Sequence, residues 1–104
     1  MSKADFNFDR TQFMAVVDYT SQTGQASSAR VTFNASNVTR IYFRKCKERK
    51  FMFFEYDSEQ IEIKATGCGF PVVFYKSKNE KEWEMYKEQL RKFAAEHRIT
   101  IEEE

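Results

Sequence analysis

One stretch near the C-terminus constrains the fold most, because it combines the only tryptophan with the longest apolar stripe at helical spacing. Residues 79–97 begin at Asn79, a residue type favoured at helix N-caps, and Glu82 follows three positions later, as in a capping box. The stripe lies on one face of a 3.6-residue repeat. It consists of Trp83, Tyr86, Leu90, Phe93 and Ala94. The pattern therefore predicts one amphipathic helix over 79–97, with Trp83 in the core.

Nearly everything before this helix has the pattern of β-strands, because segments rich in aromatic and β-branched residues alternate with short polar or charged stretches. The predicted strands are residues 13–20, 29–34, 38–44, 50–56, 60–65 and 72–76. The predicted connections are a polar loop over 21–28, a turn over 35–37, a charged hairpin turn over 45–49, a tight connection over 57–59 and a glycine turn over 67–69. One helix with a broad aromatic face is what a small sheet needs to bury its inner side. The predicted fold class is α+β, a bent antiparallel sheet of about six or seven strands closed by one C-terminal helix.

The two ends of the chain carry weaker patterns. Residues 1–11 alternate Phe6 and Phe8 with polar residues, which predicts a short leading strand or a loose arm. Residues 99–101 are predicted to add a last short strand or to pack as a tail, and residues 102–104 to form a solvated acidic end. At 104 residues the chain is predicted to form a single domain over 1–104.

Composition excludes several classes of protein. With 41% hydrophobic residues and 11 Phe, disorder is excluded as the main state. No apolar run approaches the ~20 residues of a membrane-spanning helix. Residues 1–5 lack an apolar signal segment, so we predict a cytoplasmic location.

No residue pattern supports catalysis or a cofactor. Cys46 and Cys68 are predicted to be reduced thiols rather than a disulfide, and His97 is the only histidine, too few ligands for a zinc site. A nucleophilic cysteine with His97 as its base has no supporting motif. The turn at 67–69 lacks the third glycine and the following helix of a dinucleotide-binding loop. We predict a protein that is not an enzyme and uses no cofactor or metal.

The uneven charge is the main functional hint. Residues 28–50 carry seven cations and one acid, whereas residues 51–104 carry eight cations and twelve acids. The predicted binding residues are the cations of one hairpin and an interleaved tyrosine: Arg40, Tyr42, Arg44, Lys45, Lys47, Arg49 and Lys50. Base stacking on an aromatic ring beside cations is typical of single-strand binders. The alternative is that these cations only keep an edge hairpin soluble and deter strand pairing.

The same hairpin carries more apolar residues than one core can take. Strand alternation prevents its large apolar side chains from all facing one side. They are Tyr42, Phe43, Met52 and Phe54. An outward apolar surface predicts a second layer, a partner or a homo-oligomer.

The end of the chain resembles a pleckstrin-homology-like domain. The resemblance is carried by residues 73–83 and by Leu90, a strand that runs through a short polar turn into a helix with Trp83 near its start. It implies that cations around the first hairpin would bind phosphoinositide. The loop over 21–28 contains no cation, and the first cation after it is Arg30, so phosphoinositide and membrane binding are not favoured. The family also has many protein-binding members. The same ending is similar to transcription-coactivator-type binders of single-stranded DNA, which pair as dimers and present a basic sheet.

Together these patterns predict a small non-enzymatic binding module, a protein-interaction adaptor or inhibitor whose basic hairpin meets an acidic protein surface. The alternative is a single-stranded nucleic-acid-binding protein. The fold alone does not distinguish a protein-interaction module from a nucleic-acid-binding protein.

Overall fold

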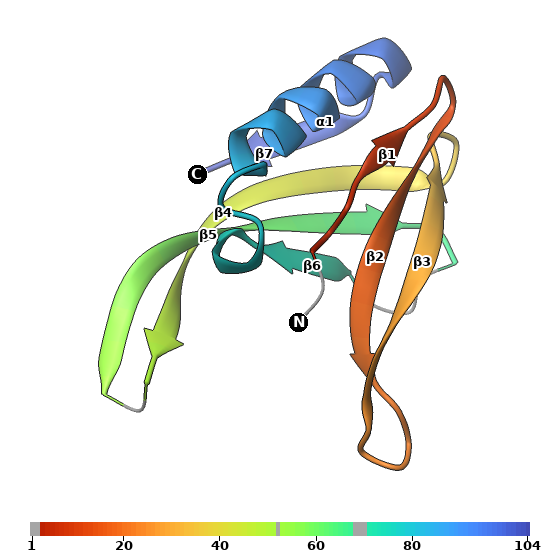
Figure 1. Cartoon of the computed structure of the whole chain (residues 1–104). Helices are drawn as coiled ribbons and strands as arrows, with labels where there is room; N and C mark the ends of the chain where they lie inside the picture. The colour runs from red at the N-terminus through yellow and green to blue at the C-terminus, as the bar shows by residue number, and fades with distance from the viewer. Residues whose placement is uncertain (1–2, 52, 68–70) are drawn as a thin grey trace.

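The computed structural model describes residues 3–51, 53–67 and 71–104, and within them the chain forms seven strands and one α-helix (Figure 1). The elements are β1 (Asn7–Phe8), β2 (Gln12–Thr20), β3 (Ala26–Asn34), β4 (Val38–Lys50), β5 (Phe54–Ala65), β6 (Val72–Tyr75), the 3₁₀ turn η1 (Lys76–Lys78), α1 (Trp83–His97) and β7 (Thr100–Glu103). The predicted α+β class, strand number and C-terminal helix are confirmed. The single bent sheet is matched only roughly, because the strands divide into two sheets.

The first sheet has the order β1-β2-β3 and is antiparallel throughout. Strands β2 and β3 pair from Gln12↔Asn34 to Thr20↔Ala26, so β3 begins earlier than predicted. The loop between them is correspondingly shorter than 21–28. It is closed by a hydrogen bond from Ser21 N to Gln25 O and by Gly24, whose φ of 85° suits a residue without a side chain.

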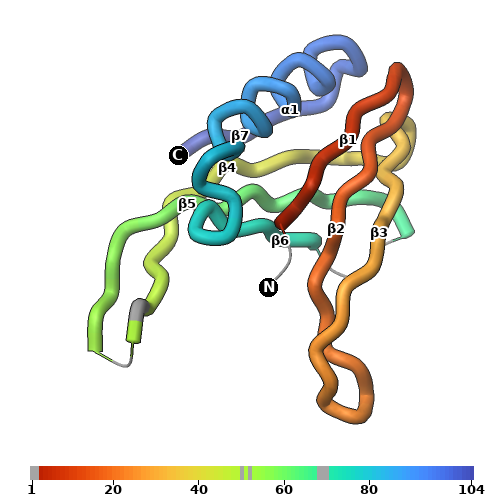
Figure 2. The backbone as a smooth tube through the Cα atoms, in the orientation of Figure 1, coloured from red at the N-terminus to blue at the C-terminus, as the bar shows by residue number. Residues whose placement is uncertain are grey.

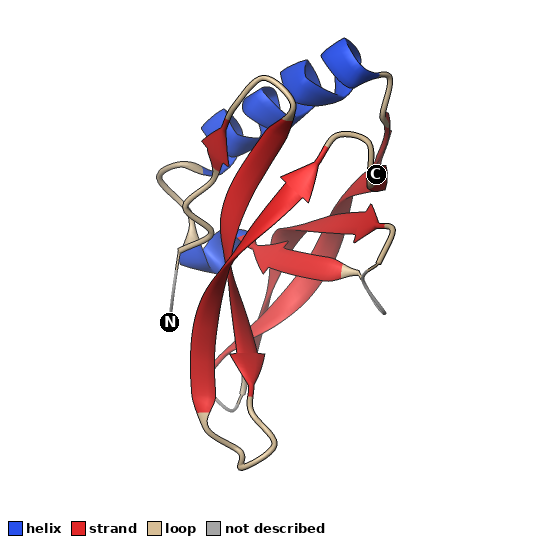
Figure 3. Ribbon diagram, turned by 90° about the vertical axis from the view of Figure 1, so that its right-hand side faces the viewer, coloured by secondary structure: helices blue, strands red, loops and turns tan. Residues whose placement is uncertain are grey.

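The second sheet has the order β6-β5-β4-β7. Strands β4, β5 and β6 are antiparallel neighbours, whereas β7 lies parallel to β4. The chain leaves one edge of this sheet at β6, passes through α1 and returns to the opposite edge as β7 (Figure 3). Strand β7 therefore confirms the last short strand that was predicted over residues 99–101. None of the helical segments in the described ranges combines the length and apolarity that crossing a membrane requires.

The core lies where the two sheets meet the apolar face of α1. Trp83 is 1% exposed, which confirms its predicted place. The largest side chains buried with it are Phe13, Ile41, Ile61, Ile63 and Leu90. The ring of Phe6 packs edge-on against Phe74 and Tyr86, with ring centroids 4.9 Å apart in each pair. Ala4 and Phe6 are thus part of the core with Phe8 packed against it, and residues 7–8 form a short leading strand, the first of the two predicted alternatives.

The predicted N-cap at Asn79 is wrong. Helix α1 begins at Trp83, and its N-cap Glu82 makes no side-chain capping bond. Asn79 is 2% exposed and ties two distant segments together. Its Oδ1 accepts a hydrogen bond from Ala4 N at 2.7 Å, and its Nδ2 donates to Tyr75 O at 2.9 Å. Asn79 lies four residues before the first residue of α1, so its side chain joins the N-terminal segment to β6 and is not at the helix start.

The predicted turns at 45–49 and 57–59 are wrong as well, because β4 and β5 run straight through both. Strand β4 continues to Lys50 and β5 starts at Phe54, so the hairpin reverses between these two residues and the predicted strand over 50–56 is wrong. The extra length forms a two-stranded arm, residues 44–50 and 54–59, beyond the part that pairs with β6 and β7. Figures 1 and 2 show this arm bending away from the helix and projecting in the same direction as the β2–β3 hairpin, at the other side of the molecule.

Candidate interaction surface on the β4–β5 arm

The charges of the arm form a cross-strand ladder. Lys45 lies opposite Glu59, Lys47 opposite Asp57, and Arg49 opposite Glu55. Opposite charges on directly paired residues stabilise a sheet, which explains why this charged segment continues as strand. The whole hairpin, residues 38–65, carries seven cations and five acids. The strongly basic hairpin predicted from β4 alone is therefore largely offset by β5.

Three of the six predicted binding cations form ion pairs: Arg40, Arg44 and Arg49. Arg40 Nη1 lies 2.9 Å from Glu102, and Arg44 Nε lies 2.9 Å from Glu62. Arg49 Nε lies 3.6 Å from Glu55, and Lys45 and Lys47 are exposed on the same face of β4. The side chain of Lys50 lies outside the described residues. Lys45, Lys47 and Arg49 thus lie on one face of β4. Arg40 and Arg44 lie on the same strand but are ion-paired with Glu102 and Glu62.

Tyr42 is not an open stacking platform. It is 9% exposed, although it lies on the face of β4 opposite the core residue Phe43. The guanidinium carbon of Arg44 lies 4.3 Å from the ring centroid and Lys64 Nζ lies 5.7 Å from it. Tyr42 and Phe43 thus lie on opposite faces of β4, as strand alternation predicted, but the outward-facing Tyr42 is buried, so its predicted exposure is wrong. Met52 lies outside the described residues, and Phe54 remains exposed.

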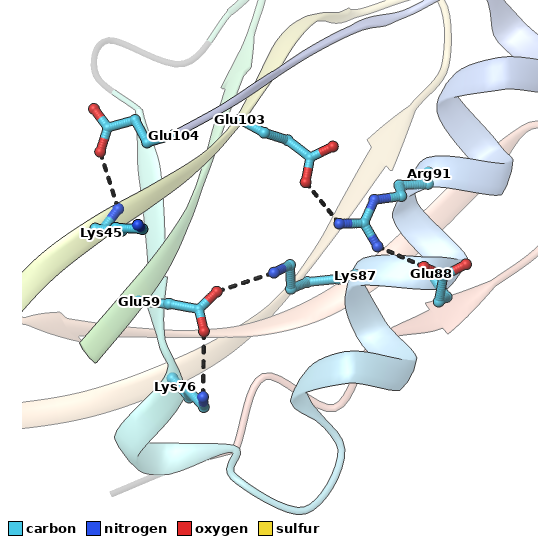
Figure 4. A network of polar contacts seen from close by, with 8 residues as sticks. All are labelled: Lys45, Glu59, Lys76, Lys87, Glu88, Arg91, Glu103 and Glu104. Atoms are coloured by element: carbon cyan, nitrogen blue, oxygen red, sulfur yellow. Dashed lines mark hydrogen bonds and ion pairs between the residues drawn. The ribbon is translucent and has the colours of Figure 1, made fainter. Parts of the chain in front are cut away.

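The predicted solvated acidic end is instead an acidic edge strand. Glu102 and Glu103 belong to β7, and Glu103 Oε1 lies 2.6 Å from Arg91 Nη2 on α1 (Figure 4). The hydrogen bond from Arg91 outweighs burial and lowers the pKa of the Glu103 carboxyl. Glu104 N donates to Phe43 O at 3.0 Å, and Lys45 N donates to the Glu104 side chain at 3.0 Å. Residues 102–104 therefore bind along β4 rather than extend into solvent.

The root of the arm is fixed by η1 and α1. Glu59 accepts hydrogen bonds from Lys87 Nζ at 2.9 Å and from Lys76 Nζ at 3.2 Å, and Figure 4 shows these contacts converging from two elements. Burial raises the pKa of Glu59, but the two lysine hydrogen bonds outweigh it and hold the pKa below its usual value. Ser77 Oγ donates to Glu48 Oε1 at 2.6 Å, which ties η1 to the other strand of the arm. The arm is thus braced where it leaves the body.

The far end of the arm carries exposed aromatic side chains. Phe51 is 76% exposed, Phe53 is 87% exposed and Phe54 is 67% exposed, and Tyr56 is also exposed. These four residues are called the aromatic tip below. The predicted binding residues did not include Phe51, Phe53 or Tyr56, although the run of apolar residues over 51–54 predicted an outward apolar surface on this hairpin. No other part of the described structure buries these four side chains.

Phe51 also has an unusual backbone. Its φ is 59°, in the left-handed region that a non-glycine residue occupies at a cost of about 1–2 kcal/mol. A bulky residue held in this conformation on an exposed turn contributes no burial in return. Local strain of this kind clusters at functional sites.

The thiol of Cys46 has the surroundings of an unreactive group. Burial raises its pKa, and the nearby carboxylates of Glu48 and Glu59 raise it further, so the thiolate is disfavoured. Its sulfur is free, as predicted, whereas Cys68 lies outside the described residues. His97 contacts Arg10 O at 2.6 Å and packs on Phe93 instead of approaching Cys46.

The described ranges contain no group of three His, Cys, Asp or Glu side chains placed to hold a metal ion. The arm combines an exposed aromatic tip, a ladder of opposite charges along its two strands and a root held by contacts to η1 and α1. Comparison of this chain with protein-family models, curated proteins and solved structures finds no match in any of the three.

Proposed function

We propose that this protein is a small non-enzymatic protein-interaction module, an adaptor or inhibitor, that docks the aromatic tip of its β4–β5 arm into an apolar pocket of a partner. The observation that carries the proposal is the exposure of Phe51, Phe53 and Phe54 at the end of a braced, projecting arm. Exposed contiguous apolar surface on a small domain is typical of interaction sites. Large aromatic anchors that enter a partner's pocket supply most of the binding energy at such sites.

The bracing of the arm supports this proposal. The ladder of opposite charges along the arm and the contacts of Glu59 and Glu48 at its root restrict its motion before binding. An element that is already ordered loses less conformational entropy when it binds. The strained backbone of Phe51 fits the same interpretation, because glycine would suit that position better unless the ring itself is needed.

Single-stranded nucleic-acid binding is the alternative, and it has less support. A phosphate backbone that followed Lys45, Lys47 and Arg49 would also pass Glu59, Asp57 and Glu55. Tyr42, the predicted stacking residue, is buried beneath Arg44. The aromatic tip retains rings on which bases could stack.

Site-specific crosslinking tests the proposed docking. A photoreactive phenylalanine analogue at Phe53 is expected to give one discrete protein adduct in cells, and the added substitution Phe54→Ser is expected to remove it. The matched control places the same analogue at Met85, an exposed apolar residue on α1. Adducts that are absent at Phe53, or the same from both positions, would refute docking through the tip.

An oligonucleotide titration separates the two functions. Binding to single-stranded nucleic acid should weaken steeply with salt, because each neutralised phosphate releases ~0.7 counterion. We expect no binding of a labelled mixed-sequence oligonucleotide at physiological salt. Tight binding at that salt, lost in Phe53→Ser but not in Met85→Ser, would favour the nucleic-acid function instead.

A further inference from the structure

The inference concerns the outer edge of β4, beyond the point where β7 ends. Strand β7 pairs with β4 only from Arg40 to Phe43, and within the described residues no strand pairs with that edge from Lys45 to Arg49. On the other side of the arm, η1 packs against β5 through Lys76 and Glu59. Among the described residues, β6 pairs with β5 only from Gln60 to Ile63, so no strand pairs with either edge of the arm. The β4 edge differs from the β5 edge in its charge, because it carries Lys45, Lys47 and Arg49.

The direction of the backbone groups along this edge follows from two hydrogen bonds. Phe43 O accepts from Glu104 N, and Lys45 N donates to the Glu104 carboxylate. Both groups therefore point away from β5, toward the side of β7. Backbone groups two residues apart in a strand face the same side. The N–H and C=O groups of Lys47 and Arg49 consequently face the open edge.

The Glu104 carboxylate occupies the position that a strand carbonyl would take. It accepts the hydrogen bond of Lys45 N at 3.0 Å, one step beyond the last backbone bond of β7 to β4. A side-chain oxygen at this point shows that the first open amide of the edge is accessible and bonds a carboxylate-bearing segment. A further strand would replace it and continue along Lys47 and Arg49.

The charge of the edge specifies what that strand would carry. Lys45, Lys47 and Arg49 lie on one face of β4 and are exposed. Residues of an added strand that lie beside them share that face, so acids at every second position would complete a ladder of alternating charge. The existing neighbour is already of this type, because β7 holds Glu102 against Arg40. Lysines on an edge repel neutral or basic strands, which makes the edge selective.

We infer that the open edge of β4 at Lys45–Arg49 binds an acidic, extended segment of a partner protein as an added β-strand. This inference rests on the proposed interaction function and names the chemistry of the partner: an apolar pocket for the tip and, beside it, a strand with alternating acidic residues. Main-chain hydrogen bonds supply affinity in such strand addition, and side chains at alternate positions supply specificity.

The test is a titration with a short blocked peptide that alternates Glu with Thr or Val, followed by amide NMR. We expect shifts and slowed hydrogen exchange at the amides of Lys47 and Arg49. Two control peptides separate the contribution of side-chain charge from that of main-chain hydrogen bonds. The first replaces Glu by Lys, and the second carries N-methyl groups on the edge that would bond to β4. Neither is expected to bind. Equal binding of either control would overturn the inference.

Protein variants make the test sharper. Lys47→Pro removes one edge N–H, is tolerated where that group faces outward, and should weaken peptide binding at least tenfold beyond Lys47→Ala. Glu104→Ala frees the amide of Lys45 and should tighten binding several-fold. Unchanged affinity in Lys47→Pro, with an unchanged melting temperature, would refute strand addition.

The outcome is separable from that of the proposed function. The peptide should bind equally to Phe53→Ser, because Phe53 lies beyond the end of β4 and contributes no backbone group to the edge from Lys45 to Arg49. A failed peptide titration beside a specific adduct from position 53 would remove only this inference. Bound peptide with no adduct would remove tip docking and keep the edge site. Concentration-dependent shifts at Lys47 and Arg49 without peptide would show a second copy as the occupant and overturn the acidic partner.

Discussion

At the scale of single residues, Asn79 shows how a buried polar group joins distant parts of the chain. Its side chain bonds Ala4 and Tyr75 and is almost fully buried. Those two bonds hold the N-terminal segment, with the ring of Phe6, against β6. The sequence placed Asn79 at a helix start because asparagine is common there. Only the fold shows that its partner lies 75 positions earlier.

Substitution of Asn79 by alanine is expected to destabilise the protein by about 1–3 kcal/mol, because the buried amide of Ala4 loses its acceptor. Urea denaturation should show a lower midpoint, and the Ala4 amide should exchange faster with solvent. The exposed Asn7→Ala change in β1 is the control, with an effect within about 0.5 kcal/mol. Equal midpoints for the two variants would contradict the role given to Asn79.

Phe51 leads to a prediction of the opposite sign. Phe51→Gly is expected to raise the free energy of unfolding by about 0.5–1 kcal/mol, because glycine adopts positive φ readily and little burial is lost. The same change should abolish the crosslink from position 53. Thermal melting checks the first part, with Phe53→Gly as the control at a neighbouring exposed position. A lower melting temperature for Phe51→Gly than for Phe53→Gly would show that the ring stabilises the fold.

At the scale of elements, the β4–β5 arm marks where sequence reading succeeded and where it failed. Alternation identified strands over 38–44 and 60–65, because each buries one face in the core. Between them, the sequence predicted charged turns over 45–49 and 57–59 and a separate strand over 50–56. The outer part of β4 lies beyond the core and is stabilised by the opposite charges of the residues that pair with it on β5. Those partner residues come later in the sequence. The pairing of Lys47 with Asp57 can be seen only after the register is known.

Glu59 at the root of the arm makes stability depend on pH. Its folded pKa lies below the ordinary value of 4.5, because the hydrogen bonds from Lys87 and Lys76 outweigh burial. The unfolded chain therefore takes up this proton at a higher pH than the folded chain. The resulting stabilisation is complete above pH 4.5 and is lost as the pH falls through the folded pKa.

We expect Glu59→Gln to lower the free energy of unfolding by about 1 kcal/mol at neutral pH. The difference from the native protein should shrink as the pH falls below 4.5, the ordinary value for this carboxyl. Urea titrations at several pH values provide the measurement. Glu96→Gln, an exposed change on α1, should leave the pH profile unaltered. A difference that stayed constant down to acid pH would mean that the lysine contacts do not stabilise the fold.

At the scale of the whole molecule, the two projecting hairpins make the protein less compact than its length requires. The radius of gyration is 14.0 Å, against about 13 Å for a compact domain of roughly 100 residues. In Figures 1 and 3 both hairpins extend to the end of the molecule away from α1. The apolar stripe over 79–97 and the strand patterns before it correctly predicted an α+β chain with one C-terminal helix. They could not predict two sheets, because β3 and β4 follow one another at a turn that reads like any hairpin. The pleckstrin-homology-like resemblance stays a prediction.

The exposed aromatic tip predicts weak self-association when no partner is present. Light scattering is expected to give an apparent mass that rises with protein concentration. The combined variant Phe51→Ser, Phe53→Ser and Phe54→Ser should remain monomeric at every concentration. Its melting temperature should match that of the native protein, because these rings are exposed. A native protein of constant monomer mass at high concentration would contradict this prediction and leave docking to other proteins as the role of the tip.

The position of β7 has a consequence for the order in which the chain is made. Strand β4 acquires its parallel neighbour only after β5, β6 and α1 have been synthesised. During translation the whole outer edge of β4 is therefore exposed on the nascent chain, with the buried residues Ile41 and Phe43 on that strand. Cations at every second position beyond Phe43 would repel similar nascent chains during that interval. The charges that we propose to select an acidic partner would thus also limit association between nascent chains.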